Sequence, residues 1–289
     1  MIQNTAVQLT QDELNSFITI LTERTGIIPR ASHRDGIKSY IEKKIAEMKL
    51  SVQGYKEQLL LNKELFAGLV NGSTVNETYF FREEKQFALL HDKIFPQWRL
   101  KSPDTEIRMW SAACSYGEEA YSLALLAKTC GIKPYVTASD INSEVLEHCR
   151  RGLFLGTSLR PVDGTAFQDL IVPFKRSDGK VEFSKEIKSC INTMQLNLSE
   201  IDSPQCAALL PKNQNIIFLR NVFIYFSQEL RARILHTLAD KCLAEDGLLF
   251  VSMSEIAQTD STIIPPSLEK NVDGSVFYFH KKTGGKADG

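Results

Sequence analysis

The pattern that most constrains the fold of this chain runs from residue 107 to residue 140. A short apolar run at 107–110 enters a turn of small residues at 111–117, and a helical pattern of apolar residues follows. A second β-type run at 135–138 then ends near Asp140. Small residues let a ligand approach the backbone closely at such a turn, and an acid about 20 residues further along can hold ribose hydroxyls. The unit therefore predicts a site for a nucleoside-containing ligand. The alternative is an ordinary strand–helix–strand unit with a structural Asp.

The turn itself argues against a dinucleotide. It has one glycine, Gly117, where the dinucleotide fingerprint has three, and it has no lysine that would bind phosphate. Glu118 and Glu119 stand at the start of the following helix, where they would repel a pyrophosphate. A ligand with a positive charge and no phosphate fits this turn better. S-adenosylmethionine, which carries a sulfonium, an ammonium and a ribose, is such a ligand.

Composition excludes several classes of protein. The chain has 289 residues, a length for one large or two modest domains, and its formal net charge of −1 gives no overall attraction to nucleic acid or to an anionic membrane. No apolar run approaches the roughly 20 residues of a membrane span, and the N-terminus lacks the basic start and apolar core of a secretory signal. The six cysteines show no metal-ligand spacing, so we expect buried thiols, no metal site and a cytoplasmic protein.

The first 72 residues predict a small helical domain. Apolar residues recur at helical spacing over 11–25, 36–49, 55–61 and 64–70. Thr10 and Glu13 form a plausible capping box at the start of the first helix. A linker at 71–73 then leads into the rest of the chain, where we expect a helix over 84–99 before the strand at 107.

Residues 73–289 predict a doubly wound, mostly parallel sheet. Beyond the unit at 107–140, a helix capped by Asn142, a strand at 216–219, a helix opened by Ser227 and strands at 248–252 and 276–280 keep strands and helices alternating. Glycines and prolines interrupt this rhythm at about 155–192. Within this insertion we expect a small antiparallel hairpin, with strands at 172–175 and 181–184 around the turn at 177–179, and a third stretch at 187–196 that joins the main sheet.

Three blocks in order carry a resemblance to a known family. They are NETYFFR at 76–82, WSAACSYGEEAYSLA at 110–124 and RNVFIYF at 220–226. With these blocks the chain resembles the CheR family of chemoreceptor glutamate methyltransferases, from about residue 10 to residue 280. The resemblance implies a class I methyltransferase domain at 73–289 behind a helical domain at 1–72, with the insertion as the family's β-subdomain.

The resemblance also implies a reaction and its partners. S-adenosylmethionine would donate a methyl group to glutamate side chains on the cytoplasmic helices of bacterial chemoreceptors, the methyl-accepting chemotaxis proteins, giving glutamate methyl esters. In some members of the family the β-subdomain also binds a peptide at the receptor's C-terminal tail, and the loop at 176–180 does not indicate whether this chain does so. We expect a monomer that binds neither nucleic acid nor metal.

The family's functional residues map onto matching positions of this chain. Its cofactor contacts fall on Asn76, Thr78, Arg82, Glu119, Asp140, Asn197, Leu198, Arg220 and Asn221. For the ammonium of the donor, Glu118 is an alternative to Glu119, which fits the family alignment better. A structural role at the start of a helix is the other interpretation of Glu119.

Each mapped residue has a physical role that suits it. Asp140 would accept hydrogen bonds from the ribose, and Asn197 and Leu198 would flank the adenine, unless they only end a strand. Arg82 has the fixed charge to hold the glutamate acceptor or the donor's carboxylate, or to form a structural ion pair. Tyr225 would orient the acceptor, with core packing as the alternative. We therefore name Arg82 and Tyr225 as the candidate catalytic residues.

The chemistry requires no catalytic triad. A carboxylate is ionised at neutral pH, so the enzyme needs mainly to align oxygen, carbon and sulfur. The five histidines lie outside the three blocks, and we expect surface or packing roles for them. Two other functions stay open: a module that binds the donor or the receptor without turnover, and a methyltransferase for a small molecule or another protein.

The predicted second helix departs from the family pattern. Related enzymes carry arginines there that face an acidic receptor helix. This chain has four lysines at 38, 43, 44 and 49, and Glu42 and Glu47 dilute their charge. A solvated helix face and a weak receptor-docking surface are both consistent with that pattern.

Overall fold

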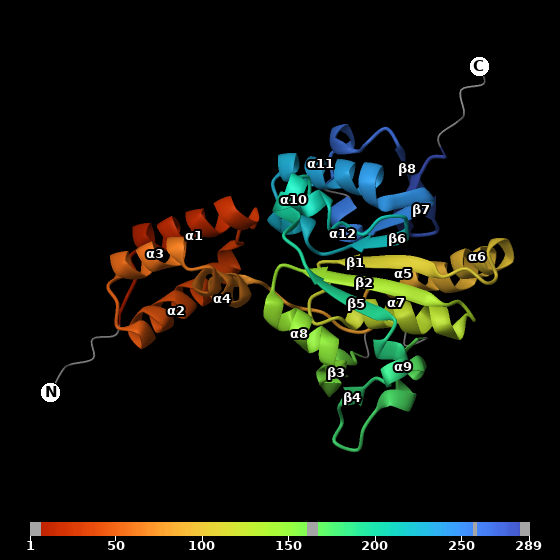
Figure 1. Ribbon diagram of the computed structural model, residues 1–289, viewed down its shortest axis with the longest axis horizontal. Helices are drawn as coiled ribbons and strands as arrows, with labels where there is room; N and C mark the ends of the chain where they lie inside the picture. Colours follow the sequence, from red (N-terminus) through yellow and green to blue (C-terminus); the bar gives the residue numbers. More distant parts are fainter. Residues whose placement is uncertain (1–6, 161–166, 257–258, 284–289) are drawn as a thin grey trace.

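The computed structural model describes residues 7–160, 167–256 and 259–283, and it has two lobes (Figure 1). The smaller lobe consists of four helices, α1 (Gln11–Thr25), α2 (Ala31–Met48), α3 (Val52–Leu61) and α4 (Lys63–Ser73). The capping box at the start of α1 is confirmed: the Thr10 hydroxyl accepts the N–H of Glu13, and the Glu13 carboxylate accepts the N–H of Thr10. Apolar stripes of these helices meet in one buried cluster, as their spacing predicts.

The larger lobe is built on a seven-stranded sheet with the order β5-β2-β1-β6-β7-β9-β8. Its strands are β1 (Ile107–Ala112), β2 (Pro134–Asp140), β5 (Ile191–Gln195), β6 (Gln214–Leu219), β7 (Leu243–Val251), β8 (Leu268–Asp273) and β9 (Val276–Lys281). The first five strands in the order are parallel, and β9 is antiparallel to both β7 and β8. The order reverses at β1, the first strand, so the sheet is doubly wound and has the class I methyltransferase topology, with an antiparallel edge.

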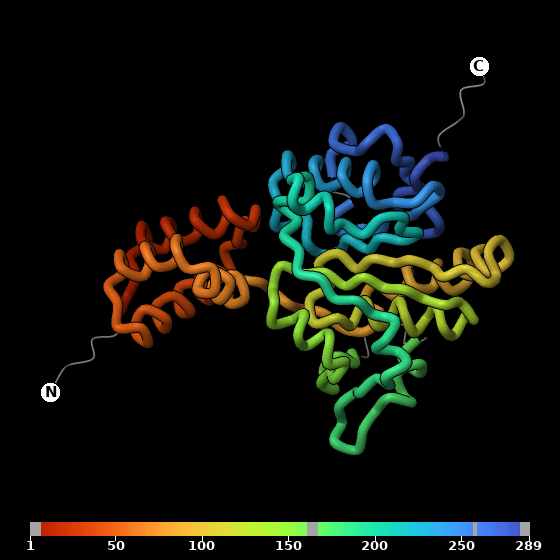
Figure 2. The backbone as a smooth tube through the Cα atoms, viewed as in Figure 1, coloured from red at the N-terminus to blue at the C-terminus, as the bar shows by residue number. Residues whose placement is uncertain are grey.

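Helices cover both faces of this sheet (Figure 1). One face carries α5 (Glu84–Leu89), α7 (Glu118–Thr129) and α8 (Ser143–Arg151), and the other carries α10 (Pro204–Ala207) and α11 (Gln228–Thr237). The helix predicted at 84–99 is confirmed, although a π-helical turn at Leu90–Ile94 separates α5 from α6 (Phe95–Lys101). The chain leaves the helical lobe through the segment after α4 and then follows the sheet (Figure 2).

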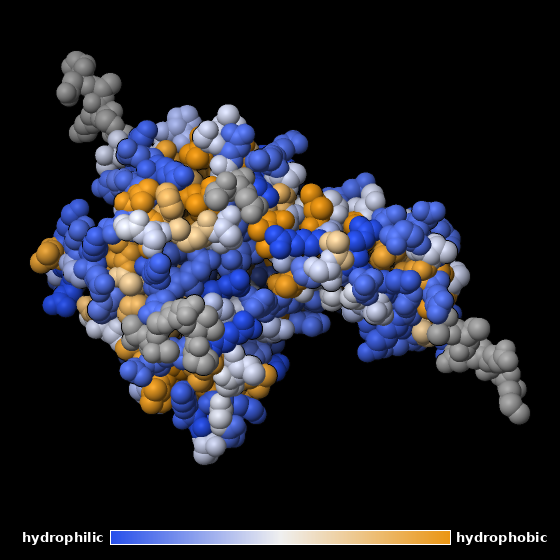
Figure 3. Space-filling view, turned by 180° about the vertical axis from the view of Figure 1, so that it is seen from behind, coloured by the Kyte–Doolittle hydropathy of each residue, from blue (hydrophilic) through white to orange (hydrophobic). Residues whose placement is uncertain are grey.

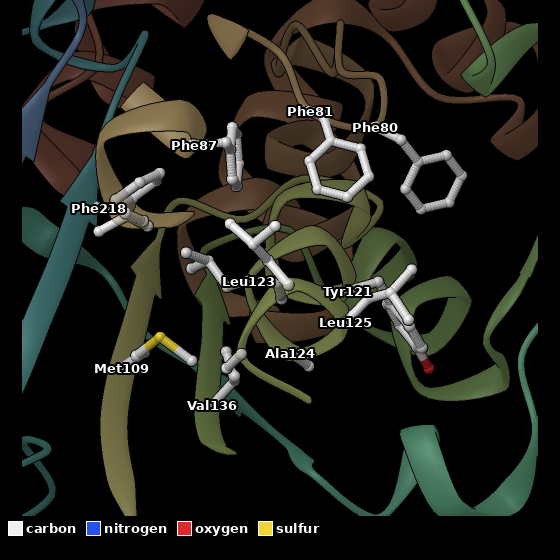
Figure 4. Close-up of a cluster of buried hydrophobic side chains, with 14 of the residues drawn as sticks. Phe80, Phe81, Phe87, Met109, Tyr121, Leu123, Ala124, Leu125, Val136 and Phe218 are labelled. Atoms are coloured by element: carbon white, nitrogen blue, oxygen red, sulfur yellow. The ribbon is translucent and has the colours of Figure 1, made fainter. Parts of the chain in front are cut away.

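The core beneath α7 is rich in aromatic side chains. Phe81 packs edge-to-face on Phe87, and Phe87 packs on Phe218 of β6, with ring centroids 5.2 and 5.5 Å apart. Figure 4 shows these rings above Leu123 of α7 and the strands. The two phenylalanines of the NETYFFR block thus anchor its backbone in the core, and Arg82 follows directly after them.

The insertion differs from the predicted hairpin. Residues 172–174, predicted as a strand, form a 3₁₀ turn, and β4 (Val181–Glu182) pairs instead with β3 (Leu153–Phe154). The predicted turn is present, closed by a bridge between Lys175 and Val181 and by the hydrogen bond from Gly179 N–H to the main-chain oxygen of Arg176. Pro173 explains the difference, because proline has no N–H to donate to a strand and suits the start of a helical turn. The third stretch was predicted to be β-type from residue 187, but residues 187 and 188 belong to the short helix α9 (Lys185–Lys188).

The two lobes are joined by polar contacts at the end of α4. The segment 71–73, predicted as a linker, is the last turn of this helix. Asn142, which caps α8 as predicted, donates to the main-chain oxygen of Asn71 at 3.2 Å and to the Thr74 hydroxyl at 2.7 Å. From behind, the helical lobe projects from the larger lobe with a mostly hydrophilic surface (Figure 3). Among the described residues, no helix is long and apolar enough to cross a membrane.

Candidate functional site

A cavity lies at the carboxyl ends of β1, β2 and β6, where the small lobe meets the sheet. It encloses about 1020 Å³ outside the protein atoms, part of it open to solvent. In doubly wound sheets ligands bind at this edge, where the strand order reverses. All the residues that the sequence analysis named as site residues line the cavity: Asn76, Thr78, Arg82, Glu119, Asp140, Asn197, Leu198, Arg220, Asn221 and Tyr225. They come from five separate segments of the chain.

Asp140 is held firmly at the tip of β2. Its Oδ2 accepts the N–H of Ser115 at 2.9 Å, and its Oδ1 accepts the N–H of Asn142 at 3.0 Å. Burial raises the pKa of this carboxyl, and the main-chain hydrogen bonds oppose the rise. Carboxylate oxygens have several lone pairs, so each can still accept a hydroxyl from a ligand.

The turn before α7 closely approaches its surroundings. Gly117 has φ +106°, and a Cβ added there would lie 2.4 Å from the Sγ of Cys149 in α8. Ala113 and Ser115 in the same turn also have positive φ. Non-glycine residues with this strained backbone conformation are concentrated at functional sites, and here they lie in the turn that faces the cavity.

Glu119 and its neighbour Glu118 have opposite environments. Glu119 faces the cavity, where its Oε1 accepts the Ser111 hydroxyl at 2.6 Å and its Oε2 pairs with Nε of Arg220 at 2.7 Å. Glu118 points into the core, where burial raises its pKa to about 7 and its Oε1 accepts the Ser158 hydroxyl at 2.7 Å. Of the two alternatives for contact with the cofactor, only Glu119 lines the cavity.

Arg220 lines the cavity and connects several of the segments around it. Besides Glu119, its guanidinium donates Nη1–H to the main-chain oxygen of Arg82 at 2.7 Å and to Oε1 of Gln86 at 3.0 Å. It also lies 4.8 Å from the ring centroid of Phe218. With 5% of its surface exposed, Arg220 ties the NETYFFR block to β6 and α7, and its charge is largely used within the protein.

Two glutamates that the sequence analysis missed hold the loop after β6. Glu255 is buried and accepts the N–H groups of Asn221 at 2.8 Å and Ile224 at 3.4 Å. Burial raises its pKa against these hydrogen bonds. Glu83 accepts from the side chain of Asn221 at 3.4 Å. Asn221 itself has φ +58°, so the loop depends on these contacts. Neither glutamate has a spacing signal in the sequence.

Asn197 and Leu198 follow β5 and line the cavity. The Asn197 side chain caps the short 3₁₀ turn Leu198–Glu200 and also donates to the main-chain oxygen of Arg24 at 2.9 Å. Leu198 is buried and presents an apolar surface beside Ile141 and Phe226. The wall therefore offers one polar side chain and apolar cover.

Arg82 and Tyr225 also line the cavity. Arg82 donates Nη1–H to the main-chain oxygen of Glu77 at 2.6 Å and forms no ion pair among the described residues. Tyr225 is half-buried, and burial raises its pKa while the nearby Arg30 and Arg82 oppose the rise. Asn76 contacts Thr74 within its own segment at 3.2 Å, and Thr78 lines the wall beside it.

The small lobe supplies part of the cavity, which the sequence analysis did not predict. Thr25, Ile27, Pro29 and His33 line it, and Ile28 donates its N–H to the main-chain oxygen of Tyr225 at 2.8 Å. The His33 ring lies 6.2 Å from the ring of Tyr225. His33 was expected to be a surface or packing residue, and it packs near Tyr225 while it lines the cavity.

Comparisons with known proteins agree with this arrangement. The model of the family described as CheR methyltransferase, SAM binding domain, matches residues 76–267. The chain is 32% identical to a chemotaxis protein methyltransferase of Vibrio parahaemolyticus over 87% of this chain and 91% of that protein. It is 32% identical to one of Escherichia coli, over 82% and 81%, and 29% identical to one of Borreliella burgdorferi, over 93% and 97%.

This chain belongs to the CheR methyltransferase family. Its cofactor is S-adenosylmethionine, which this family's domain binds. The side chains around the cavity suit that molecule: the carboxylates of Glu77, Glu119 and Asp140, several neutral amides and hydroxyls, and an apolar wall at Leu198. Among the lining residues none is a lysine, so the cavity lacks the usual partner of a nucleotide phosphate.

Proposed function

We propose that this CheR-family chain methylates glutamate side chains of bacterial chemoreceptors, in the cytoplasm, and gives glutamate methyl esters. The observation that carries the proposal is the set of charged side chains that line the cavity. Asp140 and Glu119 suit a cationic nucleoside donor, and Arg82, which has no carboxylate partner among the described residues, suits a carboxylate acceptor. Part of the cavity is open to solvent, so it can admit a side chain that belongs to a large partner.

Each group in the cavity has a role under this proposal. Asp140 holds the ribose, Glu119 attracts the donor's ammonium, and Asn197 with Leu198 surrounds the adenine. S-adenosylmethionine supplies an electrophilic methyl group, so the acceptor carboxylate attacks without a general base. Arg82, which has no carboxylate partner among the described residues, holds the acceptor by a charge-assisted hydrogen bond. The hydroxyl of Tyr225 stays protonated at neutral pH and donates to the acceptor.

The main contribution to catalysis is alignment. Fixing the acceptor oxygen in line with the methyl carbon and sulfur can lower the barrier by as much as roughly 7–11 kcal/mol. The strained turns at Ser115 and Asn221, and the ion pair between Glu119 and Arg220, hold the walls rigid before substrates bind. The similarity to chemotaxis protein methyltransferases supports the receptor as acceptor.

The test is a labelling experiment. The protein is incubated with S-adenosylmethionine carrying a labelled methyl group and with membranes that contain chemoreceptors. We expect label on the receptor that mild base releases as methanol, as a glutamate methyl ester requires. Base-stable label would indicate another acceptor atom, and donor binding without any label transfer would indicate a binding module.

A further inference from the structure

Two arginines from distant segments flank one tyrosine, and one of the two arginines also lines the cavity. The guanidinium carbon of Arg160 lies 5.2 Å from the ring centroid of Tyr79, and that of Arg82 lies 5.8 Å from the same centroid. The two carbons are therefore at most about 11 Å apart, the sum of these two distances. Arg82 lines the cavity, whereas Arg160 comes from the insertion and stands outside it.

One residue, Glu77, accepts a hydrogen bond from each of the two arginines. Its carboxylate Oε1 pairs with Nη1 of Arg160 at 2.8 Å, and its main-chain oxygen accepts Nη1–H of Arg82 at 2.6 Å. Among the described residues Arg160 has no other carboxylate partner. The side chains of Arg160 and Glu77 are 44% and 56% exposed. Ion pairs this exposed are weak, so another carboxylate can replace Glu77 at little cost.

We propose that Arg160 binds a second carboxylate of the acceptor, beside the glutamate that is methylated, and that Glu77 is a counter-ion which this carboxylate displaces. The proposal rests on the function proposed above, because it takes Arg82 as the site of the first carboxylate. The substrate class is then a protein segment with two acidic side chains close together, and a segment with a single glutamate would not belong to it.

The geometry of an α-helix allows two acidic residues of one helix to reach both arginines. On an α-helix, residues three or four apart have Cβ atoms only about 5–6 Å apart, and both side chains leave from one face. Flexible glutamates at this spacing can reach two guanidinium groups that lie within about 11 Å of each other. Arg160 would thus select a glutamate that has an acidic residue one helical turn away.

The chain contains a matched control for this pair. At the start of β1, Arg108 lies 5.8 Å from the ring centroid of Tyr135 and 4.0 Å from the carboxylate of Glu106, with 51% of its side chain exposed. It repeats the arginine, tyrosine and glutamate arrangement at the amino end of the sheet, away from the cavity. Arg108→Gln removes the same charge from a similar setting.

The experiment uses the full chain and a purified cytoplasmic helical fragment of a chemoreceptor. Mass spectrometry first locates the methylated glutamate. Acidic residues three and four positions away are then changed to glutamine in a second fragment. We expect Arg160→Gln to raise KM for the first fragment about tenfold, with kcat and donor affinity within twofold of the unmodified protein. On the second fragment the two proteins should have equal KM values.

Two further variants sharpen the result. Glu77→Gln should lower KM for the first fragment about two- to fivefold, because Arg160 is then free, and Arg108→Gln should change nothing. An unchanged KM for Arg160→Gln, an equal loss with Arg108→Gln, or an equal effect on both fragments would overturn the role of Arg160. A wild-type protein that methylates neither fragment would overturn the proposed function itself.

Discussion

Glu118 and Glu119 illustrate how one residue step along a helix changes the chemistry of a carboxyl group. A step of about 100° around the helix places Glu119 beside Arg220 in the cavity and Glu118 in the core. Glu118 has one hydrogen-bonded oxygen, and its Oε2 has no partner among the described residues. An ionised carboxylate is costly in such surroundings, which is why burial raises its pKa to about 7.

Because Glu118 is buried, its ionisation should destabilise the folded protein as pH rises, and Glu118→Gln should remove this loss of stability. The pKa of Glu118 is about 7 in the folded protein and about 4.3 in an unfolded chain. Between these values the folded state keeps a proton that the unfolded state has lost, so stability falls as pH rises. The stability of Glu118→Gln relative to the unmodified protein should therefore increase by roughly 2 kcal/mol from pH 5 to pH 8. Urea denaturation at several pH values measures this difference, and a constant difference would contradict the raised pKa.

Asp140→Ala should weaken binding of S-adenosylmethionine. The lost acceptor costs roughly 1.5–3 kcal/mol, or about 10- to 150-fold in affinity. Because Asp140 also accepts the N–H groups of Ser115 and Asn142, Asp140→Asn, which keeps one oxygen, should lose less. Calorimetric titration gives both affinities, with circular dichroism as the check on folding. Unchanged affinity in Asp140→Ala would exclude a role in holding the ribose.

Tyr225→Phe separates orientation of the acceptor from core packing. The variant keeps the ring that packs near His33 and removes only the hydroxyl. If the hydroxyl donates to the acceptor mainly in the transition state, turnover should fall about 10- to 100-fold while donor affinity changes little. Arg82→Ala, by contrast, should also weaken substrate binding. Single-turnover rates at saturating donor provide the measurement, and a wild-type rate would remove Tyr225 from the mechanism.

The turn between β1 and α7 depends on a single glycine. Gly117→Ala would place a Cβ 2.4 Å from Sγ and 2.9 Å from Cβ of Cys149, at a φ of +106° that side chains rarely adopt. We expect a loss of roughly 1–3 kcal/mol in stability and weaker donor binding, because the turn must move away from α8. Thermal unfolding and calorimetric titration test both effects. The matched control is Gly179→Ala, also at positive φ but with open space around it, which should leave donor binding unchanged.

The sequence predicts those elements whose signals are local. The capping box at Thr10, the apolar stripes of α1 and α2, and the strand–turn–helix unit around β1 are all present because each depends on neighbours within a few residues. The strand predicted at 172–175 is wrong for a local reason, since Pro173 removes a donor. The pairing of β4 with β3 depends on contacts across the insertion, which no periodicity reveals.

The residues of the site also divide into those with a local sequence signal and those placed by contacts between distant segments. Its three sequence blocks contain seven of the ten named site residues, Asp140, Asn197 and Leu198 lie outside the blocks, and the structure brings all ten together. Glu255 and His33 were missed because their positions at the site come from contacts between segments far apart in the chain. On α2, Lys43 and Lys44 each pair with Glu47, so part of their charge is already balanced. Their contact with an acidic receptor stays a prediction.

The insertion is more than an attachment to the methyltransferase domain. Phe183 stacks on Tyr121 of α7 with centroids 4.5 Å apart, and Phe154 packs on Phe80 at 5.0 Å. Replacing 165–190 with a short linker would therefore expose the aromatic core under α7. None of the described residues of 155–192 lines the cavity, which agrees with a role for the insertion outside cofactor binding.

Because both lobes line the cavity, binding of the donor should stabilise them together. A ligand at 100 times its Kd adds about 2.7 kcal/mol to the stability of the state that binds it. Hydrogen exchange should therefore slow at 113–119 and 220–226 on the sheet side, and equally at 25–29 in the small lobe, whose Ile28 bonds to Tyr225. The helix α3, which contributes no lining residue, is the internal control. Protection limited to the sheet side would mean that the small lobe does not close on the donor. In that case the first contacts of Ile27 and His33 would be with the acceptor, whose addition should then protect 25–29 while leaving 113–119 unchanged.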